Sequence, residues 1–269
     1  MKKYTLIIAL AFLTTQFVSC SKSSDTPAAT VTWTSTVSMS TKFEVPAVSG
    51  RNETASAVLQ LFSDNTLKYD IAVSNLTAGD ALAAAHIHLS NAGASGPVYI
   101  PLNGTFSGST VSGTVQLTAG QVDTIKTMQT YLNVHSTQVG SGLVRGQIDS
   151  KVVYAADIVM NGANEVPAVS TTATGLAIIR MTEDKKLYVK VTVSNIEAGD
   201  VLSAAHIHSG ISTVSGPVVL GFYSAAADFS TLKKLTVDDT FYNTLLTASL
   251  YVNAHSTARG SGLVRGQIR

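Results

Sequence analysis

Apolar and polar residues alternate along two well-separated stretches of this chain, and both have the period of a β-strand. In residues 67–73 (LKYDIAV) and 187–193 (LYVKVTV), every second side chain is apolar. Successive side chains of a strand point to opposite faces, so this period predicts strands with one buried face. The segments 74–80 and 194–200, which run from Ser-Asn to Gly-Asp, follow them and predict turns.

Further elements have the same character in both halves of the chain. Proline precedes the apolar residues 98–100 and 218–220, and the start of a strand is where its missing N–H does least harm. Residues Thr118–Gln121 and Thr236–Asp239 resemble helix N-caps with a polar residue at the third helical position. Short strands, frequent Gly/Ser/Thr turns and few charges predict an all-β fold, a sandwich or a barrel with one short helix per repeat.

The pattern occurs twice, at a spacing of about 120 residues, and several motifs recur in the same order. These motifs are EVPAV (44–48 and 165–169), AAHIH (84–88 and 204–208), SGPV (95–98 and 215–218), YLNVHST or YVNAHST (131–137 and 251–257) and GSGLVRGQI (140–148 and 260–268). We therefore predict two tandem domains, residues 31–149 and 150–269, with almost no linker between them.

Residues 1–20 have the pattern of an export signal. A pair of lysines precedes the apolar residues 6–13 (LIIALAFL), a run too short to span a bilayer comfortably. The signal ends in a small residue followed by Cys20, the only cysteine, which resembles a bacterial lipobox; the alternative is a stray cysteine beside an ordinary cleavage site. Lipid on Cys20 would hold the protein at a membrane, with residues 21–30 as a flexible tether. We expect a cell-envelope location, at the periplasmic or surface face of the outer membrane.

Composition narrows the function classes. Hydrophobic residues make up 45% of the chain and charged residues 13%, which is enough apolar material for folded cores. Cleavage before Cys20 would leave 16 basic and 17 acidic residues with no basic stripe, so we expect no nucleic-acid partner. No segment after the export signal has the roughly 18 apolar residues of a membrane-spanning helix.

All histidines of the chain lie in the repeated motifs. They are His86, His88 and His135 in the first copy and His206, His208 and His255 in the second. In a strand, His86 and His88 share one face and Ile87 lies on the other. If this strand neighbours the one that carries His135, and if the intervening apolar residues pack inward, three imidazoles converge outside the core.

Two interpretations of these histidines stay open at this point. Three imidazoles with an open fourth position suit zinc or copper. Alternatively, the His-x-His pair hydrogen-bonds a neighbouring loop, and the GPV loop that follows it is the natural target. Geometry separates the two, because a metal site requires His135 to lie within a few ångströms of both His86 and His88.

Arg145 and Arg265 each place a charge in an otherwise apolar last strand. Glu44 and Glu165, in the EVPAV motifs, are their natural partners. We predict Arg–Glu ion pairs that join the first strand of each domain to the last, with a structural rather than a catalytic role. We also expect the glycine after each arginine to admit a closely approaching backbone.

These motifs, taken together and in order, resemble the CHRD domain family, a module of chordin and of many microbial secreted proteins. AAHIH with GPV, YLNVHS or YVNAHS, and GLVRGQI carry the resemblance, and EVP lies near each start. The resemblance covers nearly all of both copies. It implies an all-β, immunoglobulin-like or barrel-like domain with no established enzymatic activity.

A weaker likeness is to the copper–zinc superoxide dismutase family, also a β-barrel with a His-x-His strand, a glycine-rich loop and a later histidine. The paired-metal site of that family needs more histidines and an aspartate than one copy supplies here. The likeness therefore implies a distant relation in fold and a single-metal site, without dismutase activity.

Two functional hypotheses remain. In the first, the chain is a non-enzymatic, lipid-anchored binding or structural protein whose loops bind a protein or glycan partner. In the second, it is a copper- or zinc-binding protein or a redox metalloenzyme that uses a three-histidine site in each domain. No GxSxG, Walker A, HExxH or dinucleotide-binding motif favours another kind of enzyme.

Overall fold

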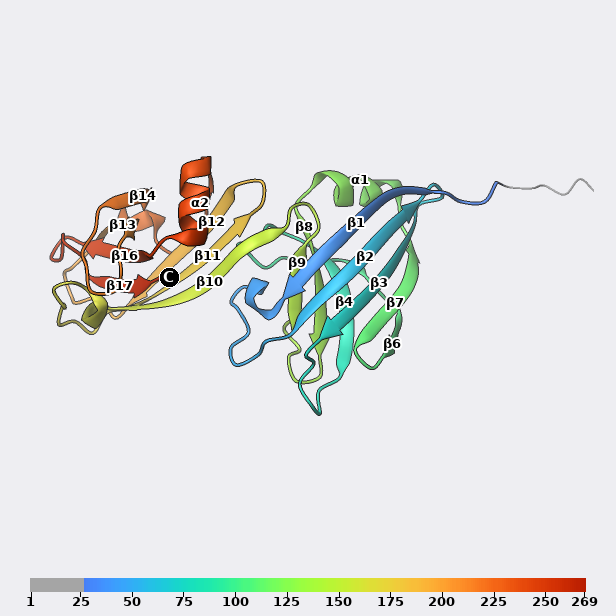
Figure 1. Ribbon diagram of the computed structural model, residues 1–269, viewed down its shortest axis with the longest axis horizontal. Coiled ribbons are helices and arrows are strands. Elements are labelled where there is room, and N and C mark those ends of the chain that lie inside the picture. The colour runs from blue at the N-terminus through green and yellow to red at the C-terminus, as the bar shows by residue number, and fades with distance from the viewer. Residues whose placement is uncertain (1–26) are drawn as a thin grey trace, which may run out of the picture.

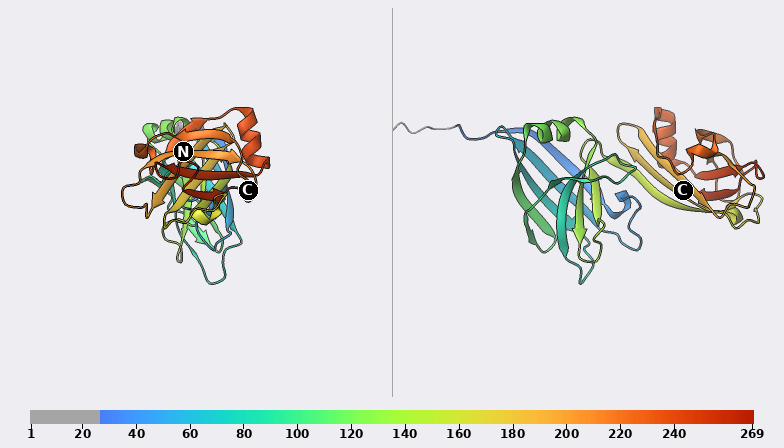
Figure 2. Two further views of the ribbon diagram at one scale, coloured as in Figure 1. Left: turned by 90° about the vertical axis from the view of Figure 1, so that its left-hand side faces the viewer. Right: turned by 180° about the vertical axis from the view of Figure 1, so that it is seen from behind.

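The computed structural model describes residues 27–269, so the predicted signal peptide and Cys20 lie outside the described residues. Two all-β modules follow one another along the long axis of the molecule (Figure 1). We call them module 1 (residues 31–149) and module 2 (residues 150–269). The views in Figure 2 show the chain entering module 1 at the end away from module 2. The predicted fold class, all-β with two tandem domains, is confirmed.

Module 1 is one strongly bent nine-stranded sheet in the order β5-β4-β8-β9-β1-β2-β3-β7-β6. Its elements are β1 (Val31–Ser40), η1 (Thr41–Phe43), β2 (Thr54–Phe62), β3 (Thr66–Ser74), β4 (Leu82–Leu89), β5 (Val98–Pro101), β6 (Thr105–Ser107), β7 (Thr110–Gln116), α1 (Ala119–Thr127), β8 (Thr130–Ser136) and β9 (Val144–Gln147). Only the pair Ser40–Arg145 joins β1 to β9. The sheet folds over at this point, and its two halves enclose the core.

Module 2 repeats this topology in eight strands, in the order β14-β13-β16-β17-β10-β11-β12-β15. Its elements are β10 (Val152–Asn161), η2 (Gly162–Asn164), β11 (Thr174–Thr182), β12 (Lys186–Ser194), β13 (Leu202–Ser209), β14 (Val218–Tyr223), η3 (Ala226–Asp228), β15 (Lys233–Thr236), α2 (Asp239–Thr247), β16 (Leu250–Ser256) and β17 (Val264–Gln267). A short 3₁₀-helix, η3, stands where module 1 has β6.

Both alternating segments form strands, and β3 has one buried face, as predicted. On β12 the prediction is wrong at Tyr188, which is buried on the opposite face. On β3, the side chains of Leu67, Tyr69 and Ile71 are at most 2% exposed. They pack in one core cluster with Ile87 of β4 and Leu132 of β8 from the other half of the sheet. Each fully buried side chain of this kind contributes about 1.5–3 kcal/mol, so the period-2 pattern is enough to set which face of each strand turns inward.

The two short α-helices begin at capped residues. Thr118 caps α1 through a capping box with Gln121, as predicted. The cap of α2 is Asp238, whose carboxylate accepts the N–H of Phe241, so the predicted start at Thr236 is wrong by two residues. Thr236 instead ends β15, where it pairs with Lys186. None of the helices in residues 27–269 is long and apolar enough to cross a membrane.

The glycines after Arg145 and Arg265 each admit a neighbouring strand, as expected. A Cβ on Gly146 would collide with the carbonyl oxygen of Ser38 in β1. A Cβ on Gly266 would lie 2.7 Å from the carbonyl oxygen of Val159 in β10. Only glycine therefore permits the close crossing of the first and last strands that closes each sheet.

Candidate metal centre

The register of β4 against β8 brings the first three histidines together. The two strands are antiparallel neighbours, with Ala84 opposite His135, His86 opposite Asn133 and His88 opposite Tyr131. Ile87 is fully buried in the core, so the imidazoles on either side of it lie on the outer face of the sheet. Both conditions that the sequence analysis set for convergence are therefore met.

The three imidazoles of module 1 lie within coordination range of a shared point. His86 Nδ1 is 3.1 Å from His135 Nε2. One ring nitrogen from each of His86, His88 and His135 lies within 4.8 Å of the other two. Module 2 repeats the arrangement with His206, His208 and His255, and His206 Nδ1 is again 3.1 Å from His255 Nε2.

Backbone carbonyls set which nitrogen of two rings faces the shared point. His88 Nδ1 donates to the Gly96 carbonyl oxygen at 3.0 Å, and His135 Nδ1 donates to that of Gly140 at 3.0 Å. A carbonyl only accepts, so the proton of each ring is on Nδ1. The Nε2 lone pair of His88 is therefore available, whereas that of His135 accepts a hydrogen bond from His86 Nδ1. His88 Nε2 is buried without a hydrogen-bond partner among the described residues. The loop-binding interpretation and the convergent interpretation therefore both hold for His88.

Burial favours the neutral form of the His86 and His88 imidazoles, which is the form that binds metals. Burial lowers the pKa of His86 and of His88 below the ordinary value, and the neighbouring His135 lowers both further. The charge of Arg145 adds to this effect at His88. The His88 ring is stacked on Tyr131 with 4.8 Å between centroids, and the Arg145 guanidinium carbon lies 3.6 Å from the Tyr131 centroid.

Module 2 repeats the stacking arrangement, and burial again favours the neutral form of two of its imidazoles. Burial lowers the pKa of His206 and of His255. His208 is stacked on Tyr251 at 4.8 Å, and the guanidinium carbon of Arg265 lies 3.4 Å from the Tyr251 centroid. The two copies therefore retain more than the histidines, because the groups that orient the rings are retained as well.

Arg145 has other partners than the sequence analysis predicted. Its side chain is almost fully buried, and one terminal nitrogen donates to the carbonyls of Asn91 and Ala94 at 2.5 and 3.0 Å. The same nitrogen donates to Gln147 at 3.0 Å. Arg145 thereby holds the β4–β5 loop, which covers His88, against the sheet.

The predicted Glu44–Arg145 and Glu165–Arg265 pairs are not among the salt bridges formed by residues 27–269. Arg265, like Arg145, donates to two loop carbonyls, at 3.1 and 2.8 Å. The physical reason is that the Arg145 guanidinium lies against the β4–β5 loop and donates to its carbonyls, whereas the Glu44 carboxyl accepts a hydrogen bond from Asn133. The charge of each arginine still acts at longer range, because it lowers the pKa of the nearby glutamate.

Glu44 is a buried carboxyl beside the first imidazole site. Burial raises its pKa to about 7, although Arg145 and a hydrogen bond from Asn133 oppose the shift. Glu44 Oε1 and Asn133 Oδ1 are both buried without partners, and both residues line a cavity of about 320 Å³ that His88 also lines. Burial likewise raises the pKa of Glu165 to about 7.

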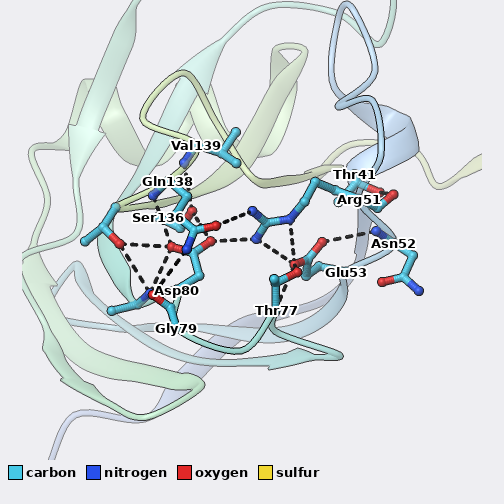
Figure 3. A network of polar contacts seen from close by, with 12 residues as sticks. Thr41, Arg51, Asn52, Glu53, Thr77, Gly79, Asp80, Ser136, Gln138 and Val139 are labelled. Atoms are coloured by element: carbon cyan, nitrogen blue, oxygen red, sulfur yellow. Dashed lines mark hydrogen bonds and ion pairs between the residues drawn. The ribbon is translucent and has the colours of Figure 1, made fainter.

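An aspartate that sequence reasoning missed organises the loop after His135 (Figure 3). Asp80 accepts hydrogen bonds from the Ser136 and Thr137 hydroxyls at 2.7 and 3.0 Å and from the Gln138 amide at 3.1 Å. Burial alone would raise the pKa of Asp80, but these bonds and one from Arg51 outweigh it and hold the pKa below the usual range. The loop carries the Gly140 carbonyl that orients His135, so Asp80 supports the site indirectly.

The signal for this aspartate was present in the repeat. Gly-Asp ends the predicted turn in both copies, as Asp80 and as Asp200. Asp200 accepts hydrogen bonds from Thr257 Oγ1 and from the Ala258 amide, each at 2.9 Å. The turn itself does not require an aspartate at its last position. The recurrence of the aspartate in both copies was therefore a sign that its carboxylate contacts a distant loop.

Comparison with protein-family models finds the CHRD domain twice in this chain, at residues 35–148 and 157–268. The two matches contain all six histidines, and Arg145 and Arg265 as well. No curated protein and no solved structure matches the chain.

Proposed function

Since this chain belongs to the CHRD domain family, we propose that it is a binding protein in which each CHRD module holds one copper or zinc ion through three imidazoles. Family membership and the tandem all-β fold indicate a binding or structural module. We assign it no catalytic activity. The proposed metal sites identify the bound ligand as a metal ion.

One observation carries this proposal. In both modules, three ring nitrogens lie within 4.8 Å of one another. The distal nitrogens of His88 and His135 are held by backbone carbonyls, as in protein metal sites where the second nitrogen of a ligating histidine is hydrogen-bonded. A purely structural His88 would be expected to use both nitrogens, yet its Nε2 is buried and unpaired.

The donor set admits both metals. Three neutral imidazoles with an open position suit zinc, and imidazole also binds copper well. The set uses no cysteine, so neither a thiolate-rich zinc site nor a blue-copper site is proposed. Redox activity, the wider alternative, would require copper at the site.

A metal titration of the two-module chain, residues 21–269 without a histidine tag, tests the proposal. After treatment with a chelator, the protein is titrated separately with Zn²⁺, Cu²⁺ and Cu⁺ against competing chelators. We expect close to two ions per chain, with nitrogen hyperfine structure from imidazole in the Cu²⁺ electron paramagnetic resonance spectrum. Binding no tighter than that of a surface histidine for all three ions would contradict the proposal.

We propose further that lipid on Cys20 holds the protein at a membrane of the cell envelope. The lipobox-like sequence and the polar residues 21–30 that follow it support this. Because the chain enters module 1 at the end away from module 2, module 2 would extend away from the membrane (Figure 1).

Substitution Cys20→Ala is expected to move the protein from the membrane fraction to the soluble fraction, because no other residue would carry the lipid. Fractionation followed by immunoblotting measures this, with Ser21→Ala as the matched control that stays with the membrane. Equal membrane association of the two variants would count against lipid anchoring.

A further inference from the structure

The two modules meet in an interface with an apolar part and a polar part. The apolar part is formed by Phe43, Ala92, Val152, Ala155, Tyr188 and Leu232. Packing there is close: a Cβ at Gly93 would lie 2.7 Å from the side chains of both Leu232 and Tyr188. Module 2 therefore presents the outer face of its sheet to the loops of module 1 that surround the first imidazole site.

The polar part of the interface holds one short segment of module 1. Arg180, on β11, is fully buried and donates to the carbonyl oxygen of Glu44 at 2.5 Å. It also forms an ion pair with Asp157 at 2.7 Å. The other carboxylate oxygen of Asp157 accepts the amide N–H of Ala47 at 2.9 Å. Module 2 thus holds both ends of residues 44–47.

This segment connects directly to the first imidazole site. The Val45 carbonyl accepts a hydrogen bond from the Ser95 hydroxyl at 3.0 Å. The next residue, Gly96, provides the carbonyl that orients His88. The segment also shares the cavity wall with His88. A continuous series of hydrogen-bonded residues therefore runs from Arg180 to a proposed metal ligand.

Module 1 lacks the charged pair that Arg180 and Asp157 form on module 2. Arg180 lies between Ala155 and Tyr188 on the neighbouring strands of its sheet. The residue at the same place in module 1 is Gln60, which lies between Thr34 and Lys68. The equivalent of Asp157 is Thr36, by the repeat offset of the first strands.

The loops of module 2 differ in the matching way. Asn164 stands where module 1 has Phe43, and Thr213 stands where it has Gly93. Both replacements remove features that the interface uses. Within residues 27–269, no side chain of module 1 forms hydrogen bonds with the backbone of residues 165–168, as Arg180 and Asp157 do with that of residues 44–47.

A second tether is also confined to module 1 (Figure 3). Arg51 forms ion pairs with the buried Glu53 at 2.6 Å and with Asp80 at 2.5 Å. Burial alone would raise the pKa of Glu53, but hydrogen bonds from Arg51 and Thr77 outweigh it and lower the pKa to about 2. In module 2, Thr171 and Ala173 occupy the equivalent positions, so Asp200 has no arginine of this kind.

We propose that module 2 acts as a clamp on the first imidazole site, so that module 1 binds its metal ion more tightly and releases it more slowly than module 2. The inference rests on the proposed metal function. Its physical basis is preorganisation, because a site whose supporting loops are already held loses less conformational freedom on binding. Supporting contacts around metal ligands are typically worth about 10–100-fold in affinity, so we expect the two sites to differ by at least about tenfold.

The experiment isolates each site in the complete two-module chain. His208→Ala leaves the first site, and His88→Ala leaves the second. The clamp is removed by Arg180→Gln with Asp157→Thr, which installs the residues that module 1 has at the equivalent positions. Lys126→Gln, exposed on α1, is the control for loss of a charge. Competition titration with the better-bound metal gives affinities, and transfer to a chelator gives release rates.

We expect the clamp variant to weaken the first site by at least about tenfold and to speed metal release, with the second site unchanged within twofold. General destabilisation would instead affect both sites. The inference would be overturned if the two sites had equal affinities in chains that keep Arg180 and Asp157. It would also be overturned if the clamp variant left the affinity of the first site unchanged.

Amide hydrogen exchange separates this inference from the proposed function. The Ala47 amide loses its acceptor in the clamp variant, so its exchange is expected to accelerate without any metal present. Faster exchange with unchanged affinity of the first site overturns the clamp and leaves the metal function standing. No metal binding at either site of the chain with an intact clamp overturns both.

Discussion

Substitution Arg145→Ala is expected to lower the free energy of unfolding of module 1 by about 2–6 kcal/mol, because each of two loop carbonyls left without its donor costs about 1–3 kcal/mol. The Arg145 side chain is 1% exposed. Its removal leaves the Asn91 and Ala94 carbonyls without their donor and takes the guanidinium from the Tyr131 ring. The β4–β5 loop then loses its attachment to the sheet.

Denaturant unfolding followed by circular dichroism and by fluorescence of Trp33, the only tryptophan, measures this effect. Arg145→Lys is the sharper variant, because an ammonium keeps the charge but lacks the planar guanidinium that lies over the Tyr131 ring. We expect it to recover less than half of the loss. Arg259→Ala, at a partly exposed position, should change stability by less than about 0.5 kcal/mol. A loss below about 1 kcal/mol for Arg145→Ala would show that the buried arginine is dispensable.

The double substitution His88→Ala with His208→Ala is expected to reduce metal affinity at both sites by at least about 100-fold. Loss of a supporting contact alone typically costs about 10–100-fold, and here a ligand itself is lost. Each single substitution should lower the stoichiometry from two ions per chain to one. Competition titration of the single and double variants measures both quantities.

Tyr131→Phe with Tyr251→Phe is the matched control for this experiment. It retains the rings on which His88 and His208 are stacked and removes only the hydroxyls that contact Gly96 and Gly216. Metal affinity is expected to change by less than about tenfold. If the histidine variants keep their metal and only the melting temperature falls, the imidazoles are part of the scaffold, and the search for a ligand moves to the loops.

The sequence by itself determined the features that depend on local geometry and on the repeat. Alternation placed the inward face of β3, because i and i+2 side chains share a face in any strand. The same rule put His86 and His88 on one side of β4. The duplicated motifs predicted two tandem all-β modules and the family to which the chain belongs. The lipid on Cys20 stays a prediction, since it lies outside the described residues.

The tertiary structure alone decided which groups meet across long stretches of chain. His135 joins the His-x-His pair only because β8 lies beside β4 in one particular register. Arg145 was predicted to pair with Glu44, yet one of its terminal nitrogens donates to loop carbonyls more than 50 residues before it, because its long side chain reaches the folded β4–β5 loop. Arg180 donates to the Glu44 carbonyl of module 1 only because the two modules pack against each other. Local periodicity fixes which way a side chain points, whereas its partner is set by how distant segments pack.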